Sequence, residues 1–132
     1  MKKLVLLVIL ALGFFNFGCN RSYKSEKDTP ECYVWYTVGL DTRYMGVALD
    51  IVYVDEYNET ITLSTDKAFS IVLGPVERGF TAFLSAGKLG EIGNTTLKVN
   101  ILVAKNDGPF VSKVGAERVT SGSMGVEYTI DF

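Results

Sequence analysis

Hydrophobic residues follow two different patterns along this chain. Leu4 to Phe15 is an unbroken apolar run, and Lys2 and Lys3 precede it. From Tyr33 onward, apolar and polar residues alternate with a period of two, which is the spacing of a β-strand with one buried face. No later stretch shows the 3.6-residue period of an amphipathic helix. The pattern therefore divides the chain into a short apolar segment and a longer part built from strands.

The alternation predicts seven or eight short strands. It is clearest at the C-terminus, where apolar residues from Val126 to Phe132 alternate with polar ones. Residues 47–54 are apolar on both faces except at Asp50, as expected of a central strand. The other predicted strands cover residues 33–38, 60–63, 69–73, 80–86 and 95–104.

Turn residues separate these strands at spacings of about ten residues. Asp107-Gly108 suits the positive φ angles of a type I′ hairpin turn. Gly74-Pro75 and Gly79 are expected to bracket a loop. Many short strands with regular turns predict an all-β fold, a single antiparallel immunoglobulin-like β-sandwich.

The N-terminal apolar run has the features of a secretion signal. A membrane-spanning helix needs about 20 apolar residues, and this run has 12. Gly18-Cys19 follows, and a small residue directly before a cysteine resembles a bacterial lipobox. Asn16 and Phe17 depart from the standard box, as in the looser boxes of Bacteroidetes-type lipoproteins. The resemblance implies that Cys19 is acylated after cleavage, and an ordinary secretion signal is the alternative.

This signal divides the chain into three predicted parts. Residues 1–18 form the signal peptide, 19–32 a lipidated flexible tether, and 33–132 the sandwich domain. Some surface-exported lipoproteins carry acidic residues behind the acylated cysteine, and residues 20–22 (Asn-Arg-Ser) contain none. We therefore expect a bacterial envelope protein that is lipid-anchored to the outer membrane and faces the periplasm. The lipid chains make the membrane its first partner.

Composition narrows the chemistry that the domain can perform. The chain has no histidine, which excludes His-based triads and His metal sites, and its two cysteines are too few for a four-thiolate zinc site. A net charge of −2 is not that of a nucleic-acid-binding domain. The 13 glycines form no phosphate-binding motif. We expect no enzymatic activity, no metal and no cofactor.

Two positions allow more than one interpretation. Asp50, with an acidic residue from 55–59, has the composition of a catalytic carboxylate pair or a calcium site, but a solvent-facing or edge charge is favoured. Cys32 is expected to be a small, half-buried apolar residue at the start of a strand. If Cys19 is not acylated, a Cys19–Cys32 disulfide is the alternative.

Three aromatic residues, Tyr33, Trp35 and Tyr36, cluster beside the tether. Aromatic side chains on a β-surface stack on sugar rings or pack against a partner protein. Tyr33 and Trp35 share one face of the predicted strand, and Tyr36 lies on the other. All three are candidate binding residues, and we expect at least Trp35 to be buried.

Several strand sequences carry a resemblance to a known family, and it covers about residues 33–132. The stretches that carry it are Tyr36-Thr37-Val38-Gly39, Lys67-Ala68-Phe69, Phe83 to Ala86, Leu97 to Val103 and Val126 to Ile130. With the signal and tether, they resemble the small single-domain lipoproteins of Bacteroidetes that have an immunoglobulin-like sandwich. These are similar in turn to the soluble domain of the MmpS family, membrane-anchored accessory proteins of lipid exporters. The resemblance implies a non-enzymatic envelope lipoprotein that binds or scaffolds a protein, glycan or lipid, or alternatively an accessory subunit of a lipid transporter.

Overall fold

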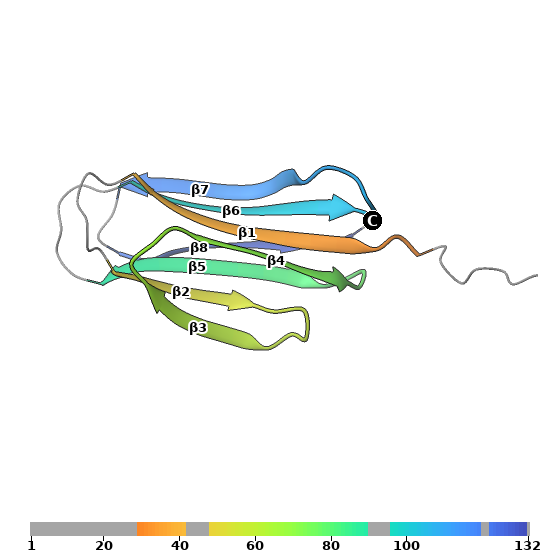
Figure 1. Ribbon diagram of the computed structural model, residues 1–132, viewed down its shortest axis with the longest axis horizontal. Helices are drawn as coiled ribbons and strands as arrows, with labels where there is room; N and C mark the ends of the chain where they lie inside the picture. Colours follow the sequence, from red (N-terminus) through yellow and green to blue (C-terminus); the bar gives the residue numbers. More distant parts are fainter. Residues whose placement is uncertain (1–28, 42–47, 90–95, 120–121, 132) are drawn as a thin grey trace, which may run out of the picture.

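The computed structural model of the chain describes residues 29–41, 48–89, 96–119 and 122–131, and the predicted signal peptide and Cys19 lie outside these ranges. Within them the regular structure is entirely β (Figure 1). The strands are β1 (Cys32–Asp41), β2 (Ala48–Val54), β3 (Thr60–Thr65), β4 (Phe69–Val76), β5 (Thr81–Leu89), β6 (Thr96–Lys105), β7 (Val111–Val119) and β8 (Met124–Thr129).

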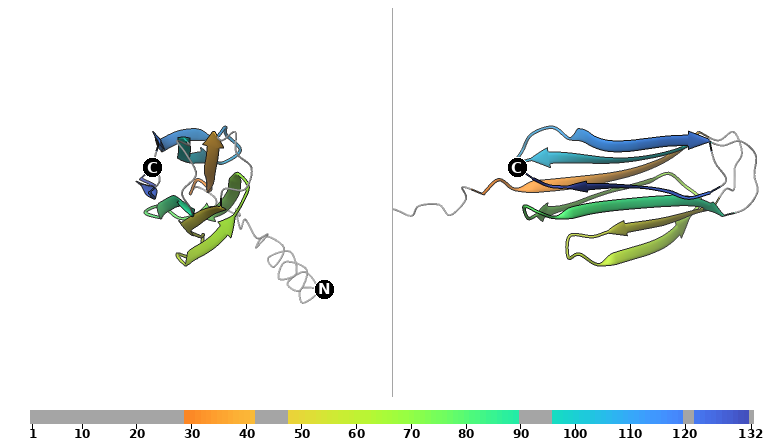
Figure 2. Two further views of the ribbon diagram at one scale, coloured as in Figure 1. Left: turned by 90° about the vertical axis from the view of Figure 1, so that its left-hand side faces the viewer. Right: turned by 180° about the vertical axis from the view of Figure 1, so that it is seen from behind.

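The strands form two four-stranded antiparallel sheets that pack face to face (Figure 2). The first sheet has the order β4-β1-β6-β7, and the second has the order β3-β2-β5-β8. This confirms the predicted antiparallel β-sandwich. The likeness to an immunoglobulin domain is one of architecture, because the central pairs here are β1–β6 and β2–β5, unlike the A-B-E-D and C-F-G order of a constant domain.

The core lies between the sheets and is built by the alternation seen in the sequence. On β1, Val34, Tyr36 and Val38 point inward and are at most 1% exposed, while the residues between them point outward. Tyr36 reaches across the core, where its hydroxyl donates a hydrogen bond to the carbonyl of Val54 at 2.9 Å. The buried polar group is thereby satisfied, as a close-packed apolar interior requires.

The two edge strands of the first sheet differ from the sequence prediction. β7 was not separately predicted, because most of its side chains are exposed and its sequence therefore lacks a clear apolar period. β4 continues through Gly74-Pro75, where a loop was expected. Proline has no N–H for a neighbouring strand, and an edge strand tolerates this because one of its sides faces solvent.

The turn between β6 and β7 is confirmed, but its backbone is not the predicted one. The positive φ angle falls on Asn106, at 54°, and not on Asp107 or Gly108. Asparagine adopts this conformation more readily than most residues. The Gly108 amide closes the turn on the Lys105 carbonyl at 3.1 Å. The Asp-Gly pair therefore located the hairpin correctly, but the two left-handed residues predicted at Asp107 and Gly108 are replaced by one at Asn106.

Candidate functional site: the outer aromatic face

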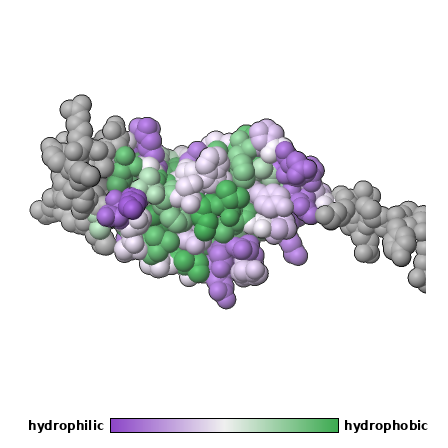
Figure 3. Space-filling view, in the orientation of Figure 1, coloured by the Kyte–Doolittle hydropathy of each residue, from purple (hydrophilic) through white to green (hydrophobic). Residues whose placement is uncertain are grey.

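A group of apolar side chains lies on the solvent side of the first sheet. Trp35 on β1 is in register with Val72 on β4 and with Leu102 on β6, so the three share one face. Tyr33 lies two residues before Trp35 on the same side, and Phe110 packs beside Trp35. We call these five residues the outer aromatic face. Figure 3, which looks onto β1 and β4, shows hydrophobic residues gathered over the middle of this side of the molecule.

Trp35 is not a core residue, which corrects the expectation that it is buried. Its side chain points out of the sandwich and is only half-buried. The indole Nε1–H donates to the hydroxyl of Ser70 on β4 at 2.7 Å, and the ring meets Phe110 edge-on at 5.4 Å between centroids. The hydrogen bond to β4 and the aromatic contact fix the orientation of the indole on this face of the sheet. An oriented tryptophan is thus presented to solvent.

Tyr33 lies across β4 at a point where only glycine leaves enough room. A Cβ atom on Gly74 would come within 2.9 Å of the Tyr33 ring and 2.8 Å of the Cys32 carbonyl oxygen. Gly74 also has a φ of +133°, which side-chain-bearing residues rarely adopt. The Tyr33 hydroxyl donates to Glu31 at 3.0 Å. The position of Tyr33 therefore depends on a residue 41 places away in the chain.

The rest of this face is apolar and partly exposed. Val72 is 52% exposed and is one of the most exposed large apolar side chains in the described ranges. Leu102 and Phe110 are half-buried. Ser112 lies next to Leu102 and donates to the side chain of Asn100 at 2.7 Å, which adds a polar border. An apolar centre with a polar rim is the usual anatomy of a recognition surface.

Tyr36, the third aromatic candidate, lies on the opposite side of β1. Its side chain is 0% exposed and contacts the ring of Tyr53 at 5.7 Å between centroids. Burial raises the pKa of its hydroxyl far above the ordinary value of 10, because the charged form would lose its hydration. The parity predicted from the sequence is correct, and it separates Tyr36 from the surface that carries Tyr33 and Trp35.

Cys32 is the first residue of β1 and is more deeply buried than expected. It is 0% exposed and carries a free thiol. Desolvation raises the pKa of this thiol, and the nearby charge of Lys105 opposes the shift. A buried, protonated thiol is a poor nucleophile. Its role is therefore that of a small apolar residue in the core.

The acidic residues of β2 and its turn do not form a pair. Asp50 lies on the outer face of a central strand and accepts a hydrogen bond from Ser64 at 3.1 Å. Asp55 accepts bonds from the amides of Tyr57 and Glu59, at 2.9 and 2.8 Å, and so shapes the β2–β3 turn. Five residues of extended chain place Asp50 and Asp55 about 17 Å apart, beyond the 5–9.5 Å of glycosidase carboxylates. The charge on Asp50 faces solvent, as favoured from the sequence.

Neither metal ligation nor membrane crossing is visible in the part of the chain that the structure describes. There, no group of three or more His, Cys, Asp or Glu side chains is placed to hold a metal ion. The same residues contain no helix long and apolar enough to span a bilayer.

Comparison with known proteins does not add to this description. No protein-family model, curated protein or solved structure matches the chain. Sequence reasoning found Tyr33 and Trp35 but missed Val72, Leu102 and Phe110. Val72 and Leu102 become neighbours of Trp35 through strand register, and Phe110 reaches it from the segment before β7. Alternation within one strand reveals neither kind of contact.

Proposed function

We propose that this protein is a non-enzymatic, lipid-anchored envelope lipoprotein that binds a partner through the outer aromatic face. The observation that carries the proposal is the oriented, half-exposed Trp35 at the centre of an apolar patch on an otherwise well-packed sandwich. Exposed tryptophan with apolar neighbours is typical of the centre of a binding surface. The partner is an envelope protein, glycan or lipid.

The anchor is supported by the lipobox-like Gly18-Cys19 and by the way the chain enters the domain. Glu31 is held to the β6–β7 turn by two hydrogen bonds, from the Asn106 amide to the Glu31 carbonyl at 2.6 Å and from the Glu31 amide to the Asn106 side chain at 3.1 Å. The domain would therefore hang from a defined point at one end of the sandwich. The outer aromatic face runs along the side of the sandwich and would stay accessible.

Acyl labelling tests the anchor. Cells fed a palmitate analogue should incorporate it into the wild-type chain, and Cys19→Ala should abolish the label and release the protein from the membrane fraction. Cys32→Ala is the matched control and should keep the label, because Cys32 is buried in the domain. Equal labelling of wild type and Cys19→Ala would overturn the lipid anchor.

Affinity capture with surface variants tests the face. The wild-type chain, captured from gently solubilised membranes, should retain one stoichiometric partner, and Trp35→Ser should lose it. Tyr57→Ser is the matched control: Tyr57 is 77% exposed at the β2–β3 turn, outside the face. We expect Trp35→Ser to weaken binding at least about 30-fold, since central interface aromatics contribute about 2 kcal/mol or more.

The outcomes of the capture experiment separate the alternatives. Equal loss with Trp35→Ser and Tyr57→Ser would remove the outer aromatic face from the proposal. A multi-spanning exporter as the captured partner would favour the accessory-subunit function that the MmpS resemblance implies.

A further inference from the structure

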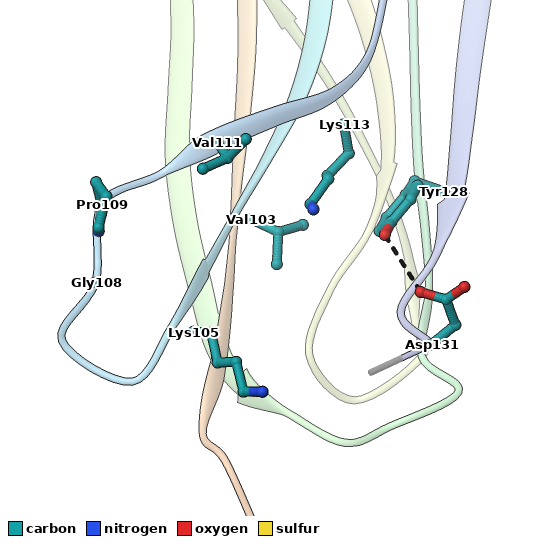
Figure 4. Close-up of a pocket in the computed structure, with 8 residues that line it drawn as sticks. All are labelled: Val103, Lys105, Gly108, Pro109, Val111, Lys113, Tyr128 and Asp131. Carbon is teal, nitrogen blue, oxygen red and sulfur yellow. Dashed lines mark hydrogen bonds between the residues drawn. The ribbon is translucent and has the colours of Figure 1, made fainter.

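A cleft of about 260 Å³ opens between the two sheets, at the end of the sandwich where the chain enters (Figure 4). One wall comes from β6, β7 and their turn, and the other from β8 and the residues after it. The outer aromatic face lies on the other side of the first sheet. The cleft is therefore a separate feature of the molecule.

A β-bulge directs a lysine into this cleft. Ile101 pairs with Val114 and Leu102 pairs with Ser112, so Lys113 is an extra residue in β7. Bulges redirect side chains away from the regular alternation of a strand. The Lys113 ammonium lies 5.9 Å from the centre of the Tyr128 ring, within the range of a cation–π contact. Figure 4 shows Lys113 reaching into the cleft beside Tyr128.

The cleft combines an apolar wall with charged groups. Val103, Pro109 and Val111 supply the apolar wall. Val111 is 52% exposed, which is unusual for a valine on the inward side of a sandwich. Lys105 lines the same cleft at its end near the β6–β7 turn, so two lysine side chains belong to the lining (Figure 4).

One carboxylate, from Asp131, faces the same space. Asp131 accepts a long hydrogen bond, 3.5 Å, from the Tyr128 hydroxyl on the β8 wall. With Lys105 and Lys113 opposite, the lining side chains of the described residues carry two positive charges and one negative charge. An anion is favoured on the lysine side of the cleft and repelled on the Asp131 side.

We propose that this cleft binds an anionic amphiphile, a phosphate or carboxylate group that carries an apolar chain. The anionic group lies between the ammonium groups of Lys105 and Lys113, and the first carbons of the chain pack on Val103 and Val111. The volume fits this assignment: about 150 Å³ holds a benzene-sized molecule, and drug-sized ligands need about 300–1,000 Å³. The site takes a head group and a short length of chain.

Two sources could supply this chemistry, a free amphiphile or an anionic phospholipid. The second source rests on the proposed lipid anchor, since Cys19 and Thr29 are ten residues apart and lie within roughly 35 Å of each other in any conformation. Binding of a free amphiphile does not depend on the anchor or on the outer aromatic face.

Lysine footprinting by mass spectrometry tests the site with hexyl phosphate as the probe. The full-length chain is held in phosphatidylcholine nanodiscs and acetylated briefly with and without the probe. We expect hexyl phosphate to slow labelling of Lys105 and Lys113 severalfold. Lys67, exposed in the β3–β4 turn at the opposite end of the sandwich, is the internal control and should not change. No slowing at Lys113, or equal slowing at Lys67, would overturn the proposal.

Matched probes and variants check each half of the ligand. Inorganic phosphate and hexanol at the same concentration should each slow the acetylation of Lys105 and Lys113 far less than hexyl phosphate does. Equal slowing by inorganic phosphate would refute the role of the apolar chain of the ligand. In the Lys105→Gln variant, the affinity for hexyl phosphate, measured by protection of Lys113, should fall about tenfold, which corresponds to one hydrogen bond to a charged group. In the Asp131→Asn variant, this affinity should rise, and no folding defect would produce such a gain. Weaker binding in Asp131→Asn would contradict the assigned charge pattern.

A change of lipid identifies the source. Nanodiscs in which a third of the lipid is phosphatidylglycerol are labelled without hexyl phosphate. Protection of Lys105 and Lys113 there assigns the ligand to the membrane. Protection by hexyl phosphate alone assigns it to a free amphiphile, and this result holds whether or not Cys19 is acylated.

Discussion

Single residues decide how the outer aromatic face is built. Tyr33 can lie across β4 only because Gly74 has no side chain, and Trp35 is oriented by the hydroxyl of Ser70. Both contacts join residues far apart in the sequence. At this scale, the surface depends on a missing Cβ atom and one hydrogen bond as much as on the aromatic rings themselves.

Alanine substitutions at three glycines separate backbone strain from steric overlap. Gly74→Ala should be the most destabilising, by about 3 kcal/mol, because it adds overlap with Tyr33 and Cys32 to an unfavourable φ. Gly79→Ala should cost about 1 kcal/mol, since its φ of +88° is unfavourable but the space around it is open. Gly39→Ala has ordinary geometry and should be neutral or slightly stabilising. Urea unfolding measures all three, and equal losses at Gly74 and Gly79 would show that the overlap with Tyr33 is relieved without cost.

The regularity of each strand depends on whether it lies at the centre or at the edge of its sheet. β1 and β6 are central and alternate clearly, whereas β4 and β7 are edges and carry irregularities: Gly74-Pro75 in β4 and the bulge at Lys113 in β7. Edge strands accept such features because only one side is committed to hydrogen bonding. The two irregular edges are the elements next to the proposed surfaces.

Two aspartates near the ends of β2 should differ in their effect on stability. Asp55→Ala should cost about 1–2 kcal/mol, because it removes the acceptor for two backbone amides of the β2–β3 turn. Asp50→Asn should change stability by less than about 0.5 kcal/mol, since its one hydrogen bond, to Ser64, is on the solvent side. Denaturant midpoints measure both. A larger loss at Asp50 would mean that its carboxylate has a structural role that a solvent-facing charge does not.

The whole molecule combines a closed core with two distinct open surfaces. The outer aromatic face covers the solvent side of the first sheet, and the cleft lies between the sheets at the end where the chain enters. Glu31 and the β6–β7 turn are joined by hydrogen bonds at that same end. An anchored molecule would therefore carry the cleft at its tethered end and the outer aromatic face along its side.

Thiol counting tests the closed core and the anchor together. Cys32 is 0% exposed, so it should react with a thiol reagent only when the domain unfolds, and its rate should follow global unfolding. The native wild-type protein purified from membranes should therefore show no reactive thiol if Cys19 is acylated, and one after unfolding. A Cys32 that reacts in the native state at the rate of a free peptide would contradict its burial.

Much of the fold was predictable because alternation is a local property. The buried residues of β5, β6 and β8 can be read from every second position, and Gly and Asn-Asp-Gly stretches marked most turns. The largest errors among the local predictions were the burial of Trp35 and the loop at Gly74-Pro75. The burial of Trp35 depends on which face of β1 meets the second sheet, and the strand at Gly74-Pro75 depends on β4 being an edge. Neither property is local.

The sequence by itself determined the all-β class, the positions of most strands, the opposite faces of Trp35 and Tyr36, and the candidate acylation at Cys19. These follow from period, composition and motif, which neighbouring residues already contain. Only the tertiary structure decided that Val72, Leu102 and Phe110 surround Trp35, and that Lys105, Lys113 and Asp131 face one cleft. Strand order and register bring Val72 and Leu102 to Trp35 across 37 and 67 positions. The packing of β8 against the β6–β7 hairpin brings Asp131 to Lys113 and Lys105 across 18 and 26 positions.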